Sequence, residues 1–157
     1  MVEVGENAPE FTLYDFDKKE RSLAEFLGKG KKTVLAFFPG AFTSVCTKEL
    51  CTFRDSLSIL QNLSAQILAI SVDSPFANKA FAEKNSLNFL LLSDFSRETV
   101  KKYGVVWNSL GGVVGYDTAN RAIFILDENG TIIYKWVAEN PSIEPDYEEI
   151  KAQLQKL

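Results

Sequence analysis

Short apolar runs alternate along the chain with longer segments whose apolar residues recur at helical spacing, and this alternation predicts an α/β fold. The runs Val34–Phe38 and Ile67–Ile70 are apolar throughout, which is typical of central strands covered on both faces. We therefore expect these two strands to lie side by side. The expected strands are Glu10–Tyr14, Thr33–Phe38, Gln66–Val72, Phe89–Leu92, Ala122–Leu126 and Thr131–Trp136.

Several of the helical segments have recognisable ends. Ser74 followed by Pro75 is typical of a helix start, because serine caps the helix and proline fits its first position. Gly104 marks a helix end, since glycine readily adopts the left-handed conformation found there. The expected helices are Ser22–Leu27, Ser44–Leu63, Pro75–Asn85, Arg97–Tyr103 and Asp146–Leu157.

Two glycine-containing segments predict turns or loops. Asn129-Gly130 separates the last two expected strands and can take positive φ, so these strands are expected to form an antiparallel hairpin within a mixed sheet. The stretch Gly111–Gly115 predicts a loop, and its spacing does not match a phosphate-binding fingerprint. We assign this loop no nucleotide-binding role.

Length and charge narrow the class of protein. The 157 residues, 46% of them hydrophobic, fit a single domain spanning residues 1–157. A formal net charge of -4 without a basic stripe argues against a nucleic-acid partner. No apolar run approaches the ~20 residues of a membrane span, and the acidic N-terminus lacks a targeting pattern. We therefore expect a cytoplasmic protein that does not associate with membranes.

The absence of histidine excludes several kinds of chemistry. Cys-His and Ser-His-Asp hydrolases, histidine-ligated zinc and haem all need an imidazole, and the chain has none. Two cysteines supply only part of the set of about four ligands in a structural zinc site. We therefore expect neither a metal nor an organic cofactor.

Cys46 is the strongest candidate for reactivity, because it follows an apolar strand and the Pro39-Gly40 turn at the expected start of a helix. Unpaired N–H groups and the helix dipole at that position favour a thiolate. Thr43 can cap the helix or hydrogen-bond the sulfur, and Lys48 adds positive charge. Glu49, considered alone, is most simply a solvated helix side chain.

Cys51 is the other cysteine of the chain and falls within the same expected helix. In an intact helix, a separation of five residues places the two Cα atoms ~8.5 Å apart, whereas a disulfide requires less than about 7 Å. A Cys46–Cys51 disulfide would therefore require the helix to unwind. Both cysteines could instead be small buried hydrophobic residues, the usual fate of free cysteine. The spacing differs from the Cys-x-x-Cys of thioredoxin-type oxidoreductases.

The segment Pro39–Cys46 resembles the Pro-x-x-x-Thr-x-x-Cys active-site motif of the peroxiredoxin family. The resemblance extends over almost the whole chain. The other matching segments are Val4–Phe11 (Gly-x-x-Ala-Pro-x-Phe), Ser71–Ser74 (Ser-x-Asp), Phe89–Gly104 (Leu-x-Ser-Asp) and Arg121–Asp127 (Arg-x-x-Phe-x-x-Asp). The Cys-x4-Cys spacing is similar to the peroxiredoxin Q or bacterioferritin-comigratory-protein group.

This resemblance implies a thioredoxin-like three-layer sandwich, with a mixed central sheet flanked by helices. It also implies that Cys46 attacks hydrogen peroxide or an alkyl hydroperoxide and becomes a sulfenic acid. Cys51 would then form an intramolecular disulfide with it, which a thioredoxin-like or other dithiol reductant would reopen.

Supporting roles also follow from the resemblance. Arg121 would lower the pKa of the thiol and stabilise charge on the departing oxygen. Thr43 would hydrogen-bond the thiolate and the peroxide, Pro39 would shape the pocket, and Glu49 would orient Arg121. The protein could be a monomer or a homodimer.

Two alternative functions remain open on the sequence. A peroxide-responsive redox sensor or chaperone-like binding protein would unwind the helix after Cys46 on oxidation and expose Phe42, Leu50 and Phe53 to a partner. A general disulfide oxidoreductase would reduce a substrate such as insulin without any dependence on peroxide.

Overall fold

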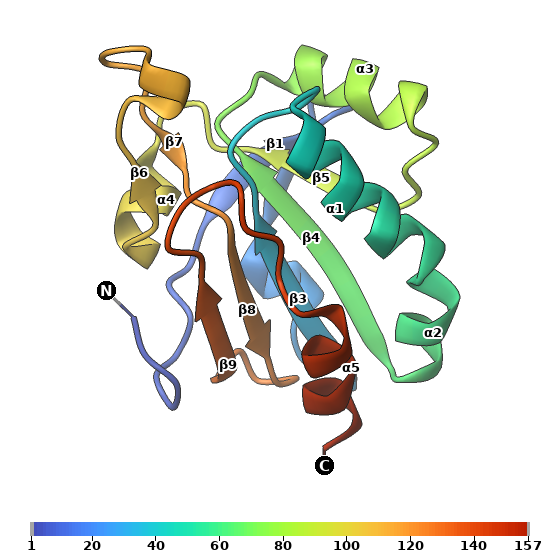
Figure 1. The fold of residues 1–157 in the computed structure, drawn as a ribbon. Helices are drawn as coiled ribbons and strands as arrows, with labels where there is room; N and C mark the ends of the chain where they lie inside the picture. The colour runs from blue at the N-terminus through green and yellow to red at the C-terminus, as the bar shows by residue number, and fades with distance from the viewer. Residues whose placement is uncertain (1, 157) are drawn as a thin grey trace.

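The computed structural model describes residues 2–156, and its centre is a β-sheet with helices on both faces (Figure 1). The strands of this sheet are β1 (Thr12–Asp15), β2 (Glu20–Ser22), β3 (Lys32–Phe37), β4 (Ala65–Ser71), β5 (Leu90–Ser93), β8 (Ala122–Leu126) and β9 (Ile132–Val137). Their order across the seven-stranded sheet is β2-β1-β5-β4-β3-β8-β9. A separate two-stranded ladder pairs β6 (Val106–Trp107) with β7 (Thr118–Ala119).

The sheet is mixed, as the sequence predicts. Strand β3 pairs in parallel with β4, and β4 in parallel with β5, whereas the other pairs are antiparallel. Val34 and Ala36 of β3 pack in the core on one face, and Leu35 and Phe37 pack in the core on the other. Burial on both faces explains why this strand is apolar at nearly every position.

The predicted hairpin joins β8 to β9 in antiparallel register. Gly130 in the turn has a φ of +89°, and a Cβ atom there would lie 2.8 Å from Cδ1 of Leu27. The backbone conformation therefore favours glycine at this position, and any larger residue would also displace the end of the Leu27 side chain.

Helices cover the two faces of the sheet unequally (Figure 1). The core of one face includes Leu50, Phe81 and Leu154 from three different helices, and the core of the other includes Leu23 and Val100. These elements are the α-helices α1 (Ser44–Asp55), α2 (Leu57–Asn62), α3 (Pro75–Lys84), α4 (Glu98–Tyr103) and α5 (Tyr147–Gln155), and the 3-10 helices η1 (Leu23–Phe26) and η2 (Leu110–Gly112).

The predicted helix ends at Ser74 and Gly104 are confirmed. The Ser74 side chain accepts a hydrogen bond from the backbone of Ala77, and Gly104 closes α4 in the left-handed conformation.

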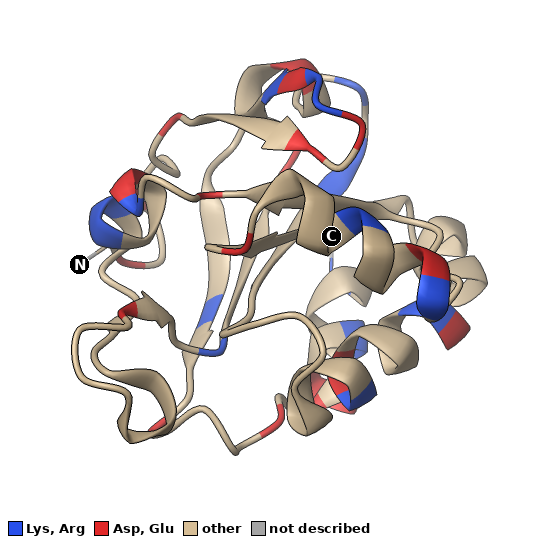
Figure 2. Ribbon diagram, turned by 90° about the horizontal axis from the view of Figure 1, so that it is seen from above, with Lys and Arg blue, Asp and Glu red and all other residues tan. Residues whose placement is uncertain are grey.

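Acidic and basic positions are mixed over the helices and loops (Figure 2). None of the helices in residues 2–156 combines the length and the apolar character that crossing a membrane demands.

Several predicted boundaries are wrong. The expected helix Ser44–Leu63 is broken at Ser56, which ends α1 and precedes α2; serine is poorly suited to a helix interior, because its hydroxyl competes for backbone hydrogen bonds. The expected helix Ser22–Leu27 is the short 3-10 helix η1. Strands β2, β6 and β7 were not predicted, because their two or three residues are too short to show a period. Leu157 of the expected last helix lies outside the described residues.

Candidate active site

Cys46 lies in the first turn of α1, where β3 and the Pro39-Gly40 turn were expected to place it, and its side chain is completely buried. Thr43 is the N-cap residue of this helix, but its side chain makes no capping hydrogen bond. Instead the Thr43 hydroxyl donates to the carbonyl oxygen of Gly40 at 2.9 Å. The hydroxyl is thus part of the turn that precedes Cys46.

Arg121 reaches Cys46 from the segment just before β8. This strand is the antiparallel neighbour of β3, with Ala122 opposite Phe37. Nη2 of Arg121 donates to Sγ of Cys46 at 3.2 Å. The guanidinium also donates to the carbonyl oxygen of Pro141, from Nε at 3.1 Å and from Nη2 at 2.7 Å. Arg121 is only 1% exposed, so these contacts fix it in one orientation.

Glu49 forms a buried ion pair with this arginine. Nη1 of Arg121 donates to Oε1 of Glu49 at 2.8 Å, and Oε2 of Glu49 has no hydrogen-bond partner among the described residues. Burial raises the pKa of Glu49 to about 7, although the charge of Arg121 opposes that rise. Glu49 is therefore not the solvated helix residue that its position alone suggested.

The electrostatics of Cys46 differ from the sequence-based expectation. Burial raises the pKa of the Cys46 thiol, while the charge of Arg121 and its hydrogen bond to the sulfur lower it. The guanidinium of Arg121 is in place to favour a thiolate, but the desolvation of a fully buried sulfur opposes it. In this structure, burial has the larger effect.

Lys48 does not contribute its charge to Cys46 in the way its position suggested. Its ammonium group pairs with Glu144 at 3.1 Å, and Glu144 also accepts a hydrogen bond from Tyr147 at 2.7 Å. Glu144 and Pro141 both come from the segment before α5, which the sequence analysis did not connect to the site. No sequence signal pointed to Pro141, because it acts through a backbone carbonyl that every residue possesses.

A pocket of about 260 Å³ opens beside the guanidinium of Arg121. The loop Gly111–Gly115, to which we assign no nucleotide-binding role, contributes Gly111 to its wall. The lining residues are Pro39, Thr43, Ser44, Val45, Leu110, Gly111, Arg121, Pro141 and Ser142. The structure therefore brings three of the predicted site residues, Pro39, Thr43 and Arg121, to one small cavity next to the buried sulfur.

Cys51 is a free thiol further along the same helix, half-buried and separate from Cys46. Its Sγ atom lies 3.8 Å from Oδ1 of Asn85, at the end of α3. Arg54 donates from Nη1 to the carbonyl oxygen of Asn85 at 2.6 Å. Because α1 is continuous through both cysteines, the helix must unwind before their sulfur atoms can meet.

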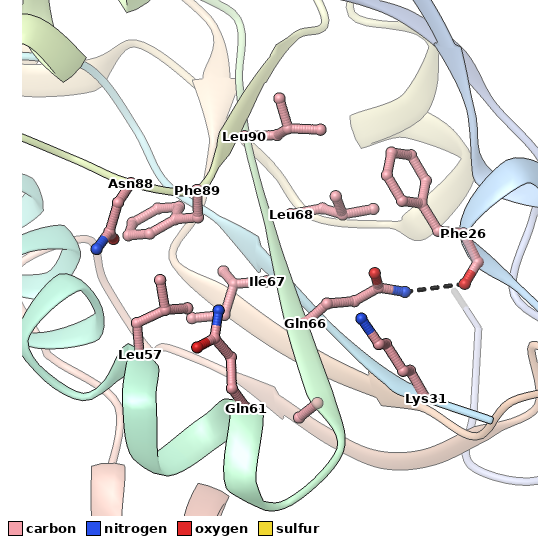
Figure 3. Close-up of a pocket in the computed structure, with 11 residues that line it drawn as sticks. Phe26, Lys31, Leu57, Gln61, Gln66, Ile67, Leu68, Asn88, Phe89 and Leu90 are labelled. Atoms are coloured by element: carbon pink, nitrogen blue, oxygen red, sulfur yellow. Dashed lines mark hydrogen bonds between the residues drawn. The ribbon is translucent and has the colours of Figure 1, made fainter. Parts of the chain in front are cut away.

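Another pocket, of about 200 Å³, has a different character (Figure 3). It lies around the first residues of β4, at the end of the strand opposite to the turn that carries Asp73, and Lys31 is its one charged lining residue. Within residues 2–156, no group of three or more histidine, cysteine, aspartate or glutamate side chains could hold a metal ion. Cys46, Glu49 and Arg121 do not line this pocket.

Comparison with known proteins places the chain in a family. Residues 4–135 match the family model described as the AhpC/TSA family. The chain is 40% identical over 131 residues to chloroplastic peroxiredoxin Q of Gentiana triflora, covering 83% of this chain and 57% of that protein. It is 39% identical over 132 residues to the bcp peroxiredoxin of Haemophilus influenzae, covering 84% of each.

Solved structures show the same fold. Peroxidoxin BcpB from Mycobacterium tuberculosis aligns with a TM-score of 0.86 and 27% identity over 99% of this chain and 97% of that chain. A peroxiredoxin-like protein from Aquifex aeolicus aligns with a TM-score of 0.85 and 28% identity over 98% of this chain and 86% of that chain. The thioredoxin-like α/β fold is thus confirmed, and the chain belongs to the AhpC/TSA family as a peroxiredoxin of the group that includes peroxiredoxin Q and bcp.

Proposed function

We propose that this protein is a thiol-dependent peroxidase that reduces hydrogen peroxide and organic hydroperoxides, with Cys46 as its nucleophile. The observation that carries this proposal is the contact of 3.2 Å between Nη2 of Arg121 and Sγ of Cys46, beside a pocket of about 260 Å³. A guanidinium in this position favours a thiolate and also meets negative charge on a departing oxygen.

In the first step, the Cys46 thiolate attacks one oxygen of the peroxide, so that an S–O bond forms and the O–O bond breaks. Sulfur is oxidised to a sulfenic acid, and the leaving oxygen departs as an alkoxide or hydroxide that takes up a proton. Arg121 stabilises that leaving oxygen through the same N–H groups that contact the sulfur. The peroxide enters through the pocket bounded by Pro39, Thr43 and Arg121.

Three side chains support this step. The Thr43 hydroxyl donates to Gly40 in the reduced site, and rotation about its Cβ–Oγ bond redirects its proton toward the thiolate or the peroxide. Pro39 shapes the pocket and shields the sulfenic acid from further oxidation. Glu49 holds one edge of the guanidinium at 2.8 Å, and this contact leaves Nη2 facing the sulfur.

Cys51 completes the cycle by attacking the sulfenic acid, which forms the disulfide and releases water. The distance across an intact helix means that α1 unwinds during this step. A thioredoxin-like or other dithiol reductant then reduces the disulfide and is itself oxidised. A reducing compartment such as the cytoplasm suits this cycle.

The similar proteins support an enzyme more than a sensor. The relatives named above are peroxiredoxins. A sensor or chaperone-like function would depend on oxidation exposing Phe42, Leu50 and Phe53, of which Phe42 is already 53% exposed and the other two are buried in this structure. No observation on the structure favours that alternative.

Steady-state peroxide consumption tests the proposal. The protein is incubated with hydrogen peroxide or an alkyl hydroperoxide, with thioredoxin and its reductase as the source of electrons. Wild-type protein should turn over many times and Cys46→Ser should not. Cys51→Ser should consume about one equivalent per chain and then stall, because oxidised Cys46 has no partner to resolve it. Full multiple turnover by Cys51→Ser with thioredoxin would contradict the role given to Cys51.

A further inference from the structure

The turn before Cys46 contains a residue in an unfavourable conformation. Phe42 has a φ of +66°, a region that bulky side chains rarely occupy. Its ring packs edge-on against Phe81 of α3 at a centroid distance of 5.2 Å, yet the residue remains 53% exposed. Because much of the Phe42 side chain is exposed, its packing alone does not hold the backbone in this unfavourable conformation. Other contacts must therefore stabilise the backbone around Phe42.

Asp73 supplies such a contact. The backbone N–H of Ala41, just before Phe42, donates to Oδ2 of Asp73 at 2.7 Å. Asp73 comes from the segment after β4, whose carboxyl end lies at the same edge of the sheet as the start of α1 (Figure 1). A hydrogen bond from a peptide N–H to a carboxylate is charge-assisted and therefore stronger than a neutral one.

The Asp73 carboxylate is itself fixed by buried neighbours. The hydroxyl of Ser71 donates to the same Oδ2 atom at 2.8 Å, and the Ser93 hydroxyl donates to the Asp73 carbonyl oxygen at 2.5 Å. Oδ1 of Asn78 lies 3.3 Å from the Ser71 hydroxyl oxygen. A hydroxyl has a single proton, so Ser71 cannot donate to both acceptors at once, and the shorter contact makes Asp73 its acceptor.

Ser71 is joined to Asp73 by a second hydrogen bond. The Ser71 hydroxyl oxygen accepts from the backbone N–H of Asp73 at 3.2 Å, while its proton is donated to the Asp73 carboxylate. Side chain and backbone of Asp73 are thus both tied to Ser71, and the same carboxylate oxygen meets the N–H of Ala41. A buried network of this kind restricts its members to one geometry.

We propose that Asp73 is a positioning residue for the peroxidase site, because its carboxylate holds the Ala41 N–H and thereby fixes the turn that places Thr43 beside Cys46. This inference rests on the proposed function. It assigns a role to the Ser71–Ser74 segment, which the mechanism above does not use. Asp73 acts through the backbone and touches neither the peroxide nor the sulfur.

The test compares Asp73→Ala with Asp73→Asn, Ser71→Ala and a matched control. The amide oxygen of asparagine can accept both hydrogen bonds, whereas alanine can accept neither. Asp127→Ala is the control, because Asp127 also accepts two backbone N–H groups, from Asn129 and Thr131 at 2.9 Å each, in the distant β8–β9 turn. Single-turnover peroxide reactions and thermal unfolding are measured for every variant.

We expect Asp73→Ala to react with peroxide about ten- to a hundredfold more slowly than wild type, because a shift of the turn displaces Thr43 from the sulfur. Asp73→Asn should recover most of the rate, Ser71→Ala should fall between them, and Asp127→Ala should lose stability without losing rate. The proposal is overturned if Asp73→Ala reacts as fast as wild type, or if Asp127→Ala slows to the same extent.

Amide hydrogen exchange at Ala41, followed by NMR, separates this inference from the proposed function. Exchange at Ala41 should be faster in Asp73→Ala and unchanged in Asp127→Ala, whether or not the protein consumes peroxide. If wild-type protein fails to react with peroxide, the proposed function fails. If exchange at Ala41 is equally slow in Asp73→Ala, the positioning role of Asp73 fails.

Discussion

Nη2 of Arg121 lies 3.2 Å from Sγ of Cys46, although the two residues are 75 positions apart in the sequence. The pairing of β3 with β8 brings them together, because Cys46 follows the end of one strand and Arg121 precedes the start of the other. Since both side chains are buried, the guanidinium is not screened by water and acts strongly on charge at the sulfur.

Replacing Arg121 with glutamine should slow the reaction of Cys46 with peroxide by about 10²–10³-fold, because a preorganised donor to the developing charge is lost. It should also raise the pKa of the thiol, which the pH dependence of Cys46 alkylation measures. Arg21→Gln is the control, since Arg21 likewise forms ion pairs, with Asp15 and Glu25, but does not contact Cys46. An equal loss of rate in both variants would contradict the role of Arg121.

Thr43→Val should lower the single-turnover rate about tenfold or more, since a hydrogen bond to a charged group contributes about 1.5–3 kcal/mol. Thr43→Ser keeps the hydroxyl that now donates to Gly40 and should retain most of the rate. If valine and serine at position 43 reduce the rate equally, the hydroxyl is not what Thr43 contributes.

Glu49 should make the folded protein less stable as the pH rises. Its pKa is raised from 4.5 to about 7 on folding, so between these values the folded state binds more protons than the unfolded state. Its contribution to stability is therefore fully present below pH 4.5 and is lost as the pH rises through 7. The total loss is on the order of 3 kcal/mol.

Urea unfolding of the reduced protein measures this effect. It is carried out at a series of pH values from about 5 to about 8, a range that includes the raised pKa of Glu49 of about 7. The free energy of unfolding should fall more steeply with pH in wild type than in Glu49→Gln, which cannot ionise. Glu148→Gln is the control, because Glu148 has an exposed side chain. Parallel curves for wild type and Glu49→Gln would show that Glu49 ionises as easily when folded as when unfolded.

Oxidation should reduce the helix content of the protein. Helix α1 spans 12 residues and contains both cysteines, so a Cys46–Cys51 disulfide requires its first turns to unwind. Far-UV circular dichroism should show a loss of helical signal on adding peroxide to wild type, and its recovery with a dithiol. Cys51→Ser should show no such change, and an unchanged wild-type spectrum after complete disulfide formation would contradict the unwinding.

Strong local patterns allowed much of the fold to be predicted. Strand β8 lies at its predicted residues, and β3 and β4 are shifted by one residue, because continuous apolar runs identify buried strands. The break at Ser56 was missed, since the apolar spacing continues across it from α1 into α2. The prediction of a single domain and of a cytoplasmic location stays a prediction.

The site could be predicted less completely than the fold. The family motif pointed to Cys46, Thr43 and Pro39, which are close together in sequence, and the resemblance added Arg121 and Glu49 as candidates. The carbonyl of Pro141, which accepts two N–H groups from Arg121, carries no mark in the sequence. The raised pKa of Cys46 depends on complete burial, which follows from tertiary packing and not from the helix start alone.

The most direct test of the central claim is the stopped-flow reaction of the fully reduced protein with peroxide, followed by tryptophan fluorescence. A thiol count and an intact mass are taken at the end. The proposed cycle predicts rapid loss of both thiols and a mass decrease equal to two hydrogen atoms, as a Cys46–Cys51 disulfide requires. Slow loss of thiols, or addition of oxygen without pairing of the cysteines, would contradict it.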